Sequence, residues 1–244
     1  IDTCFANPGT SEMHFVAALD RIPGVRCIPG MQENVVTGMA DGYFRVAQRP
    51  AATLLHCGPG LANGIANLHN AKRAHSGILN IVGDHASYHS QYDPPLAADT
   101  AELAGTVSNW VRTASRAEEV GRDASAAIQA AKTSPGQIAT LILPADTAWN
   151  EGGSPGGALP VSAPENADQT TIAEIAKTLR SAKNVLLLLG GKALRAEAQM
   201  QAARLMTLHA AWTMDTQGAS AARQDVSLIK VFGAGVMHDV IDRA

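Results

Sequence analysis

The chain has 244 residues, of which 46% are hydrophobic and 17% are charged, and its formal net charge is -3. That is enough for one large domain or two ordinary ones, and it argues against disorder as the main state. The sequence has no cluster of positive charge of the kind that nucleic-acid binding requires. Its apolar runs, such as residues 185–189, are far shorter than the roughly 20 residues that span a bilayer. We therefore expect neither a nucleic-acid nor a membrane partner.

The alternation of strands and helices over residues 1–150 predicts the fold. Strands are expected at 2–6, 25–28, 52–57, 78–82, 107–112 and 138–143, and helices at 10–20, 32–46, 61–74 and 117–132. Within the helix at 32–46, Val35, Met39 and Tyr43 form an apolar stripe. Strands separated by helices of this length are typical of an α/β fold with an open, mainly parallel sheet and helices on both faces.

The second part of the chain follows a segment rich in glycine and proline. We expect an α/β domain at 1–150, a linker at 151–168 and a second, incomplete α/β domain at 169–244. In that domain a helix is expected at 170–181, a strand at 184–189 and a helix to about residue 209. A further strand is expected at 227–232.

The three cysteines, Cys4, Cys27 and Cys57, are odd in number and form no CxxC pair. This usage favours a reducing compartment, and we expect a cytoplasmic location. Each cysteine lies among apolar residues, so we interpret all three as buried small apolar side chains. A catalytic cysteine is the minor alternative.

Ligands of open parallel sheets bind at the carboxyl ends of the strands, where three segments of this chain are expected to meet. These are residues 7–10, residues 56–63 and the helix start at Glu33. Glu33 is either a first-turn glutamate that the helix dipole favours or a desolvated carboxyl that exchanges a proton with a ligand. His56 is either a structural strand histidine or an acid–base group. No metal ligand is expected in this chain.

These segments, taken in order, resemble a known family. They are Phe5-Ala6-Asn7-Pro8-Gly9-Thr10, Gln32-Glu33-Asn34, Gly38-Met39-Ala40-Asp41-Gly42-Tyr43, Gly58-Pro59-Gly60 with Asn63, and Pro135-Gly136-Gln137 before Ile142-Leu143-Pro144-Ala145-Asp146. Nearly all of residues 1–150 resembles the N-terminal pyrimidine-binding domain of thiamine-diphosphate-dependent enzymes. The nearest members are acetolactate synthase large subunits and benzoylformate decarboxylase. Residues 169–213 resemble the start of the family's middle domain.

The resemblance implies a role for each matching residue. Glu33 matches the glutamate that hydrogen-bonds N1′ of the cofactor's aminopyrimidine and promotes the imino tautomer, which removes the C2 proton of the thiazolium. His56 and Thr10 match an active-site histidine and serine of benzoylformate decarboxylase. The positions that match the lining of the pyrimidine side of the cofactor are Pro8, Gly9, Gly58 and Asn63.

The implied reaction is the decarboxylation of a 2-oxo acid with or without carboligation, as in acetolactate synthases. A non-ligating decarboxylase like benzoylformate decarboxylase stays open. A non-catalytic α/β binding module is the alternative of another class, and a doubly wound domain of unrelated function is a third reading. In the family the active site lies between two subunits, so a homodimer or homotetramer is implied.

One departure from the family concerns the diphosphate. The Gly-Asp-Gly and Asn-Asn residues that hold the cofactor diphosphate and Mg²⁺ in a third domain are not found in this sequence. The chain begins at Ile1 and also lacks a signal-peptide pattern. We therefore expect about half of a three-domain chain, with Mg²⁺ held by the absent domain and little activity alone. Flavin binding stays open.

Overall fold

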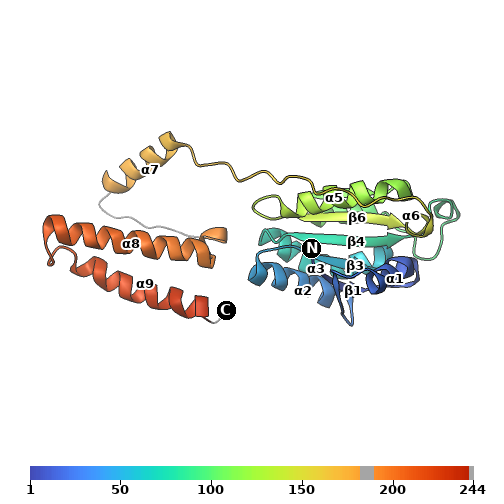
Figure 1. Ribbon diagram of the computed structural model, residues 1–244, viewed down its shortest axis with the longest axis horizontal. Helices are drawn as coiled ribbons and strands as arrows, with labels where there is room; N and C mark the ends of the chain where they lie inside the picture. The colour runs from blue at the N-terminus through green and yellow to red at the C-terminus, as the bar shows by residue number, and fades with distance from the viewer. Residues whose placement is uncertain (182–189, 242–244) are drawn as a thin grey trace. The chain divides into compact units, whose positions relative to one another are not determined.

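The computed structural model describes residues 1–181 and 190–241. The chain forms two compact units, Ile1–Glu165 and Asn166–Ala244, which are described separately (Figure 1). None of the helices in the described part of the chain combines the length and apolar character needed to cross a bilayer. The predicted domain limits of 1–150, 151–168 and 169–244 stay predictions.

The first unit contains a six-stranded, all-parallel sheet with the order β2-β1-β3-β4-β6-β5. Its strands are β1 (Thr3–Asn7), β2 (Arg26–Pro29), β3 (Ala51–Leu55), β4 (Ile78–Asp84), β5 (Trp110–Thr113) and β6 (Ile138–Pro144). The predicted open parallel α/β sheet is confirmed. Because Asn7 is in register with Leu55, the carboxyl ends of β1 and β3 lie side by side.

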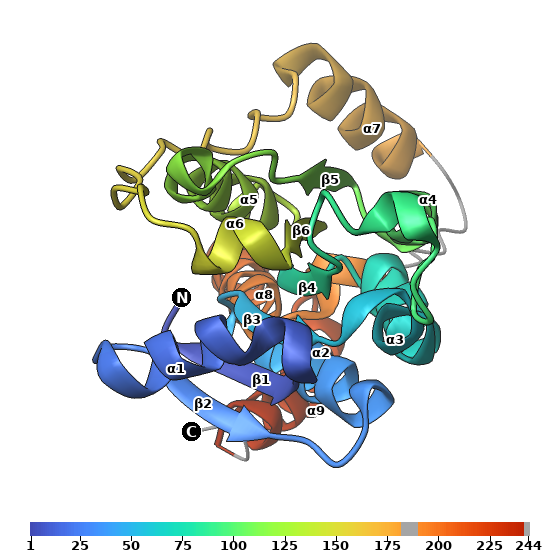
Figure 2. The ribbon, with the colours of Figure 1, turned by 90° about the vertical axis from the view of Figure 1, so that its right-hand side faces the viewer.

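Helices cover both faces of this sheet (Figure 2). One face carries α2 (Glu33–Ala47), α3 (Cys57–Arg73) and α4 (Thr100–Val107), and the other carries α1 (Met13–Arg21) and α5 (Val120–Lys132). The short α6 (Ala145–Trp149) and the 3-10 turns η1 (Thr10–Glu12), η2 (Ser90–Tyr92) and η3 (Ala117–Glu119) complete the unit.

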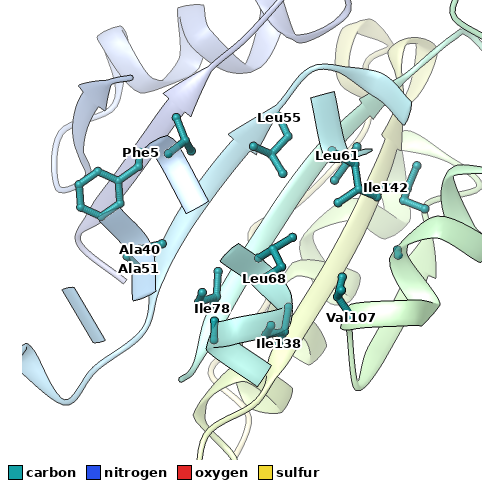
Figure 3. Packing of buried hydrophobic residues seen from close by; sticks show 14 residues of the cluster. Phe5, Ala40, Ala51, Leu55, Leu61, Leu68, Ile78, Val107, Ile138 and Ile142 are labelled. Carbon is teal, nitrogen blue, oxygen red and sulfur yellow. The ribbon is translucent and has the colours of Figure 1, made fainter. Parts of the chain in front are cut away.

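Apolar side chains of α3 fix its position over the sheet. Leu61 and Leu68 are fully buried and belong to one cluster with Leu55, Ile78 and Ile142 of three strands (Figure 3). Each such side chain contributes about 1.5–3 kcal/mol when it is removed from water. The packing therefore anchors α3 and, with it, the residues at its start.

A buried polar chain crosses the centre of the sheet. Asn80 accepts a hydrogen bond from Thr53 Oγ1 at 2.7 Å and donates to Thr140 Oγ1 at 3.0 Å. The hydroxyls of Ser108 and Thr140 are 2.7 Å apart. The amide of Asn80 is thus satisfied on both sides, as buried polar groups require.

Several predicted elements differ from the structure. In α2 the fully buried stripe is Val36, Ala40 and Phe44, whereas Val35 is 50% exposed. The predicted stripe was therefore displaced by one position, although Met39 and Tyr43 do pack beside the core. Both sets have the same spacing of four, so periodicity alone could not separate them.

The predicted start of the third helix at residue 61 is also wrong. The helix begins at Cys57, so Gly58-Pro59-Gly60 forms its first turn instead of preceding it. Proline is tolerated there because the first amides of a helix have no intrahelical partner. The helix α4 at Thr100–Val107 was not predicted, because its small and polar residues follow a proline-containing loop. The predicted strand at 107–112 is shortened to β5 as a result.

The second unit is helical in every element that the structure describes. It contains α7 (Gln169–Ser181), η4 (Gly191–Leu194), α8 (Ala196–Gln217) and α9 (Arg223–Ile241). The predicted helix at 170–181 is confirmed, and the predicted strand at 184–189 lies outside the described residues. The predicted strand at 227–232 is wrong, because these residues belong to α9. Their short apolar run is ambiguous by itself, and only the less exposed positions Val226, Ile229, Phe232 and Val236 reveal the helical spacing.

Candidate active site at the carboxyl edge of the sheet

The predicted convergence of three segments is present in the first unit. The chain leaves β1 through Pro8 and Gly9 into η1, and it leaves β3 through His56 into α3. The side chain of Asn7 donates to the carbonyl of Gly30 at 2.8 Å, which ties the exit of β1 to the segment that leads into α2. The parallel order of the strands therefore brings their exits to one edge.

Glu33 is the first residue of α2, and only 8% of its surface is exposed. Asn63 Nδ2 donates to Glu33 Oε2 at 3.1 Å. A Cβ added at Gly60 would lie 3.0 Å from Oε1, so the glycine makes room for that oxygen. Among the described residues no group donates a hydrogen bond to Oε1. Glu33 is thus both a helix-start glutamate and a buried carboxyl with one oxygen free to meet a ligand.

His56 forms a close pair with a residue that the sequence did not single out. Its Nδ1 lies 2.8 Å from Glu12 Oε2, and the same oxygen accepts a hydrogen bond from the backbone N–H of Gly9 at 2.7 Å. The Glu12 side chain is 2% exposed and that of His56 is 24% exposed. An ionised carboxylate only accepts hydrogen bonds, so Nδ1 carries a proton and Nε2 is left to act elsewhere.

The local sequence around Glu12 indicates a helix start and not a catalytic role. It stands three residues after Gly9, the spacing of a capping box, and its carboxylate accepts the backbone N–H of Gly9 as in one half of that motif. The sequence therefore indicated a helix start and gave no reason to pair Glu12 with a histidine 44 positions away. The adjacency of β1 and β3 in the sheet creates that pair.

Two glycines make this pair possible. A Cβ at Gly9 would lie 2.5 Å from Cγ of His56, and a Cβ at Gly83, near the end of β4, would lie 2.5 Å from Cδ of Glu12. Real Cβ atoms essentially never come so close. Each side chain therefore occupies space that any other residue at these positions would fill.

The remaining predicted site residues have different surroundings. Thr10 is exposed at the start of η1, and Pro8 is half-buried. Gly58 is buried, and its missing Cβ would lie 2.5 Å from Cβ of Ala98. The structure thus brings Glu33 together with Asn63, and His56 together with Gly9, while Gly58 faces the loop before α4. Their roles toward a ligand stay predictions.

Cys57 lies beside the Glu12–His56 pair. Its Sγ is 3.5 Å from Ser11 Oγ, 3.7 Å from His56 Nδ1 and 4.0 Å from Glu12 Oε1. Burial raises the pKa of the Cys57 thiol to about 11, although the Ser11 hydroxyl acts in the opposite direction. The prediction that all three cysteines are buried is wrong for Cys27, which is exposed on the edge strand β2.

Comparison with known proteins shows the family to which the residues of this edge belong. Residues 1–105 match the family described as "Thiamine pyrophosphate enzyme, N-terminal TPP binding domain". The N-terminal part of the chain belongs to the thiamine-diphosphate-dependent enzymes. Residues 187–244 match a second family, described as "Acyl-CoA dehydrogenase, C-terminal domain".

Individual relatives agree with the first of these assignments. IlvX of Mycobacterium tuberculosis (strain H37Rv), provisionally named an acetolactate synthase large subunit, is 52% identical over 88% of this chain and 42% of its own length. Benzoylformate decarboxylase of Pseudomonas aeruginosa (strain PAO1) is 31% identical over 78% of this chain and 36% of its own. The chain thus spans about two fifths of these relatives.

A solved structure is similar over the same extent. The thiamine diphosphate-dependent 4-hydroxybenzoylformate decarboxylase of Rhodococcus jostii RHA1 gives a TM-score of 0.75 at 26% identity, over 82% of this chain and 38% of that chain. The alignment with the Mycobacterium tuberculosis relative covers 217 residues, more than the 165 residues of the first unit. It therefore continues into the second unit, where the acyl-CoA dehydrogenase match also lies.

Proposed function

We propose that this chain supplies the aminopyrimidine-activating half of a thiamine-diphosphate site that decarboxylates a 2-oxo acid. The observation that carries the proposal is the buried carboxyl of Glu33, with Oε2 held by Asn63 and Oε1 free of hydrogen bonds among the described residues. A buried carboxyl with a free oxygen suits a ring nitrogen that must share a proton. The residues present therefore fit the pyrimidine end of the cofactor.

Each residue of the site has a distinct task in this proposal. Thiamine diphosphate, when bound, supplies the nucleophilic carbon and the electron sink for the loss of carbon dioxide. Glu33 holds a proton at the aminopyrimidine nitrogen N1′, and Asn63 keeps its carboxyl in place. His56 moves a proton to or from the reacting substrate through Nε2, since Nδ1 is bound to Glu12. Glu12 acts through His56 and is a positioning residue.

We propose roles for the other matching residues as well. Pro8 and Gly9 line the pyrimidine side of the cofactor at the exit of β1, and Thr10 approaches the substrate. Gly58 contributes to the site indirectly, because the absence of a Cβ lets α3 pack closely on the loop at Ala98. Mg²⁺ and the diphosphate are held by residues outside those described. We also propose that two copies of the chain form each active site between them. The protein acts in the cytoplasm.

Carboligation and simple decarboxylation remain two candidate outcomes. Similarity to the Mycobacterium tuberculosis relative supports an acetolactate-synthase-like reaction, in which a second 2-oxo acid is joined to the first. The Glu12–His56 pair supports a decarboxylase, because an oriented histidine can deliver the proton that ends the reaction without ligation.

The test uses this chain together with the remaining, C-terminal part of the Mycobacterium tuberculosis relative, supplied separately with Mg²⁺ and thiamine diphosphate. Exchange of the C2 proton for deuterium is measured by NMR, and carbon dioxide and ligated product are measured with a panel of 2-oxo acids. We expect exchange with the native chain, and loss of more than about 100-fold with Glu33→Gln, in line with the usual worth of a positioned acid–base group.

Glu118→Gln, at an exposed position in η3, is the matched control and should leave the exchange unchanged. Equal exchange with native chain and Glu33→Gln would remove the assignment of Glu33. No carbon dioxide from any 2-oxo acid, despite cofactor binding, would favour the non-catalytic binding module.

A further inference from the structure

The cluster of Glu12, His56 and Cys57 contains ligand types that the proposed cofactor chemistry does not use together. The three residues offer one carboxylate oxygen, one imidazole nitrogen and one sulfur, all within 4.8 Å of one another. Zinc and related divalent ions are bound in proteins by this combination of side chains. Mg²⁺ instead prefers oxygen ligands and retains water.

We propose that Glu12, His56 and Cys57 form a binding site for a thiophilic divalent cation of the Zn²⁺ class. This proposal does not rest on the proposed function, because it concerns only the coordination of an ion by three side chains of the first unit. The ion replaces the hydrogen bond between Glu12 and His56, so the metal-bound pair and the proton-transferring pair are alternative states of the same residues. The sequence predicted no metal ligand in this chain, and it did not single out Glu12.

The distances fit a tetrahedral ion after small shifts. Bonds of about 2.0–2.3 Å place neighbouring ligands of zinc roughly 3.3–3.7 Å apart. The Sγ of Cys57 is 3.7 Å from His56 Nδ1 and 4.0 Å from Glu12 Oε1. The 2.8 Å hydrogen bond of Nδ1 is to the other carboxylate oxygen, Oε2. This pair must open by about half an ångström, and the carboxylate of Glu12 must turn so that one oxygen meets the ion.

Burial and charge favour the same conclusion. Cys57 is fully buried and the Glu12 side chain is 2% exposed, so two ligands are withdrawn from water while His56 keeps the site accessible. On binding, the ion displaces the thiol proton of Cys57 and the Nδ1 proton of His56, and both protons pass to solvent. The carboxylate and the resulting thiolate then balance both charges of the divalent ion. Asp84, at the end of β4, is close enough for its charge to act on Cys57 and adds to the attraction. Among the described ion pairs, Glu12 has no lysine or arginine partner that would compete with a cation.

The backbone also holds the ligands in place before an ion arrives. The absence of a Cβ at Gly9 and at Gly83 leaves room for His56 and Glu12 beside Cys57. Cys57 adopts a left-handed φ of 51°, which is uncommon for a residue other than glycine. This strain at the first residue of α3 sets the thiol beside the pair.

The experiment is a titration of the purified chain with Co²⁺ in the presence of excess Mg²⁺ and without oxygen. Co²⁺ bound to a thiolate gives a charge-transfer band in the near ultraviolet and, in a tetrahedral site, intense visible bands. We expect one Co²⁺ per chain with both signals, displaced by Zn²⁺ and unaffected by Mg²⁺.

Variants identify the ligands. Cys57→Ser should abolish the charge-transfer band, whereas Cys27→Ser, which changes an exposed cysteine outside the cluster, should leave it unchanged. Glu12→Gln keeps the shape of the side chain and should weaken binding by more than about 10-fold, since even outer-shell partners of metals are worth about 10–100-fold. Absence of the band in the native chain, or its persistence in Cys57→Ser, would overturn the proposal.

Discussion

The substitution Gly83→Ala tests the Glu12–His56 pair without altering either side chain. A Cβ at this position would lie 2.5 Å from Cδ and 2.8 Å from Cγ of Glu12, and closer still to Oε1. Ordinary van der Waals contact begins at about 3.4 Å. The carboxylate must therefore move by about an ångström or more, which breaks its hydrogen bonds to His56 and to Gly9 N–H.

The cost follows from the bonds that are lost. A hydrogen bond to a charged group contributes about 1.5–3 kcal/mol, and two of them are broken. Alanine in a strand recovers about 0.5–1 kcal/mol relative to glycine. The net decrease in the free energy of unfolding is therefore about 2–5 kcal/mol. Long-range ¹H–¹⁵N NMR of the imidazole should also show that Nδ1 of His56 has lost its partner.

The assay is a double-mutant cycle measured by urea unfolding with far-ultraviolet circular dichroism. In a Glu12→Ala background the obstructing carboxylate is absent, so Gly83→Ala should then cost less than about 1 kcal/mol. Gly42→Ala in α2 is a control, because a Cβ there meets nothing within 4 Å. It should stabilise the chain by about 0.4–1 kcal/mol. An equal cost of Gly83→Ala in both backgrounds would refute the reasoning, since the clash would then not involve Glu12.

Three further predictions concern the cysteines and the core. In the native chain, thiol reagents should modify exposed Cys27 at least about 100-fold faster than buried Cys4. In urea the two cysteines should react at equal rates. Comparable rates in the native chain would contradict the burial described for Cys4. Burial raises the pKa of Cys4 to about 12 from an ordinary value of 9.0. The unfolded chain therefore loses the proton first, and the free energy of unfolding should fall by up to about 1.4 kcal/mol per pH unit as pH rises from 9.0 towards 12. In Cys4→Ala this contribution to the fall should be absent. Parallel pH profiles of the native chain and Cys4→Ala would refute this prediction. Leu68→Ala should cost about 2–5 kcal/mol in urea unfolding, because the side chain is fully buried between α3 and the sheet, and a loss below 1 kcal/mol would indicate a looser core.

The sequence predicted the parallel sheet well, because that architecture depends on the alternation of apolar strands with helices. It also predicted that the ends of the strands would meet near Glu33 and His56. What it missed is set by contacts between distant segments. The pairing of Glu12 with His56 arises only from the order β1-β3 in the sheet, and no local pattern records that order. The strand predicted at 227–232 failed because a short apolar run fits either period.

Three glycines at the carboxyl edge of the sheet share one structural role, and two of them, Gly9 and Gly60, lie in the segments that resemble the family. At each of the three glycines, one polar side chain of the site occupies the space that a Cβ would fill. The pairs are Gly9 with His56, Gly60 with Glu33 and Gly83 with Glu12. These glycines provide space for acid–base groups.

The space available for an added Cβ differs between Gly60 and Gly83. A Cβ at Gly60 would lie 3.0 Å from Glu33 Oε1 and 3.4 Å from Cβ of His56, so a shift of a few tenths of an ångström relieves it. At Gly83 the whole carboxylate must leave. Gly60→Ala should therefore preserve folding and alter mainly the proton exchange that depends on Glu33, whereas Gly83→Ala should destabilise the first unit itself. Equal losses of stability at both positions would mean that the glycines serve the backbone and not the side chains that they face.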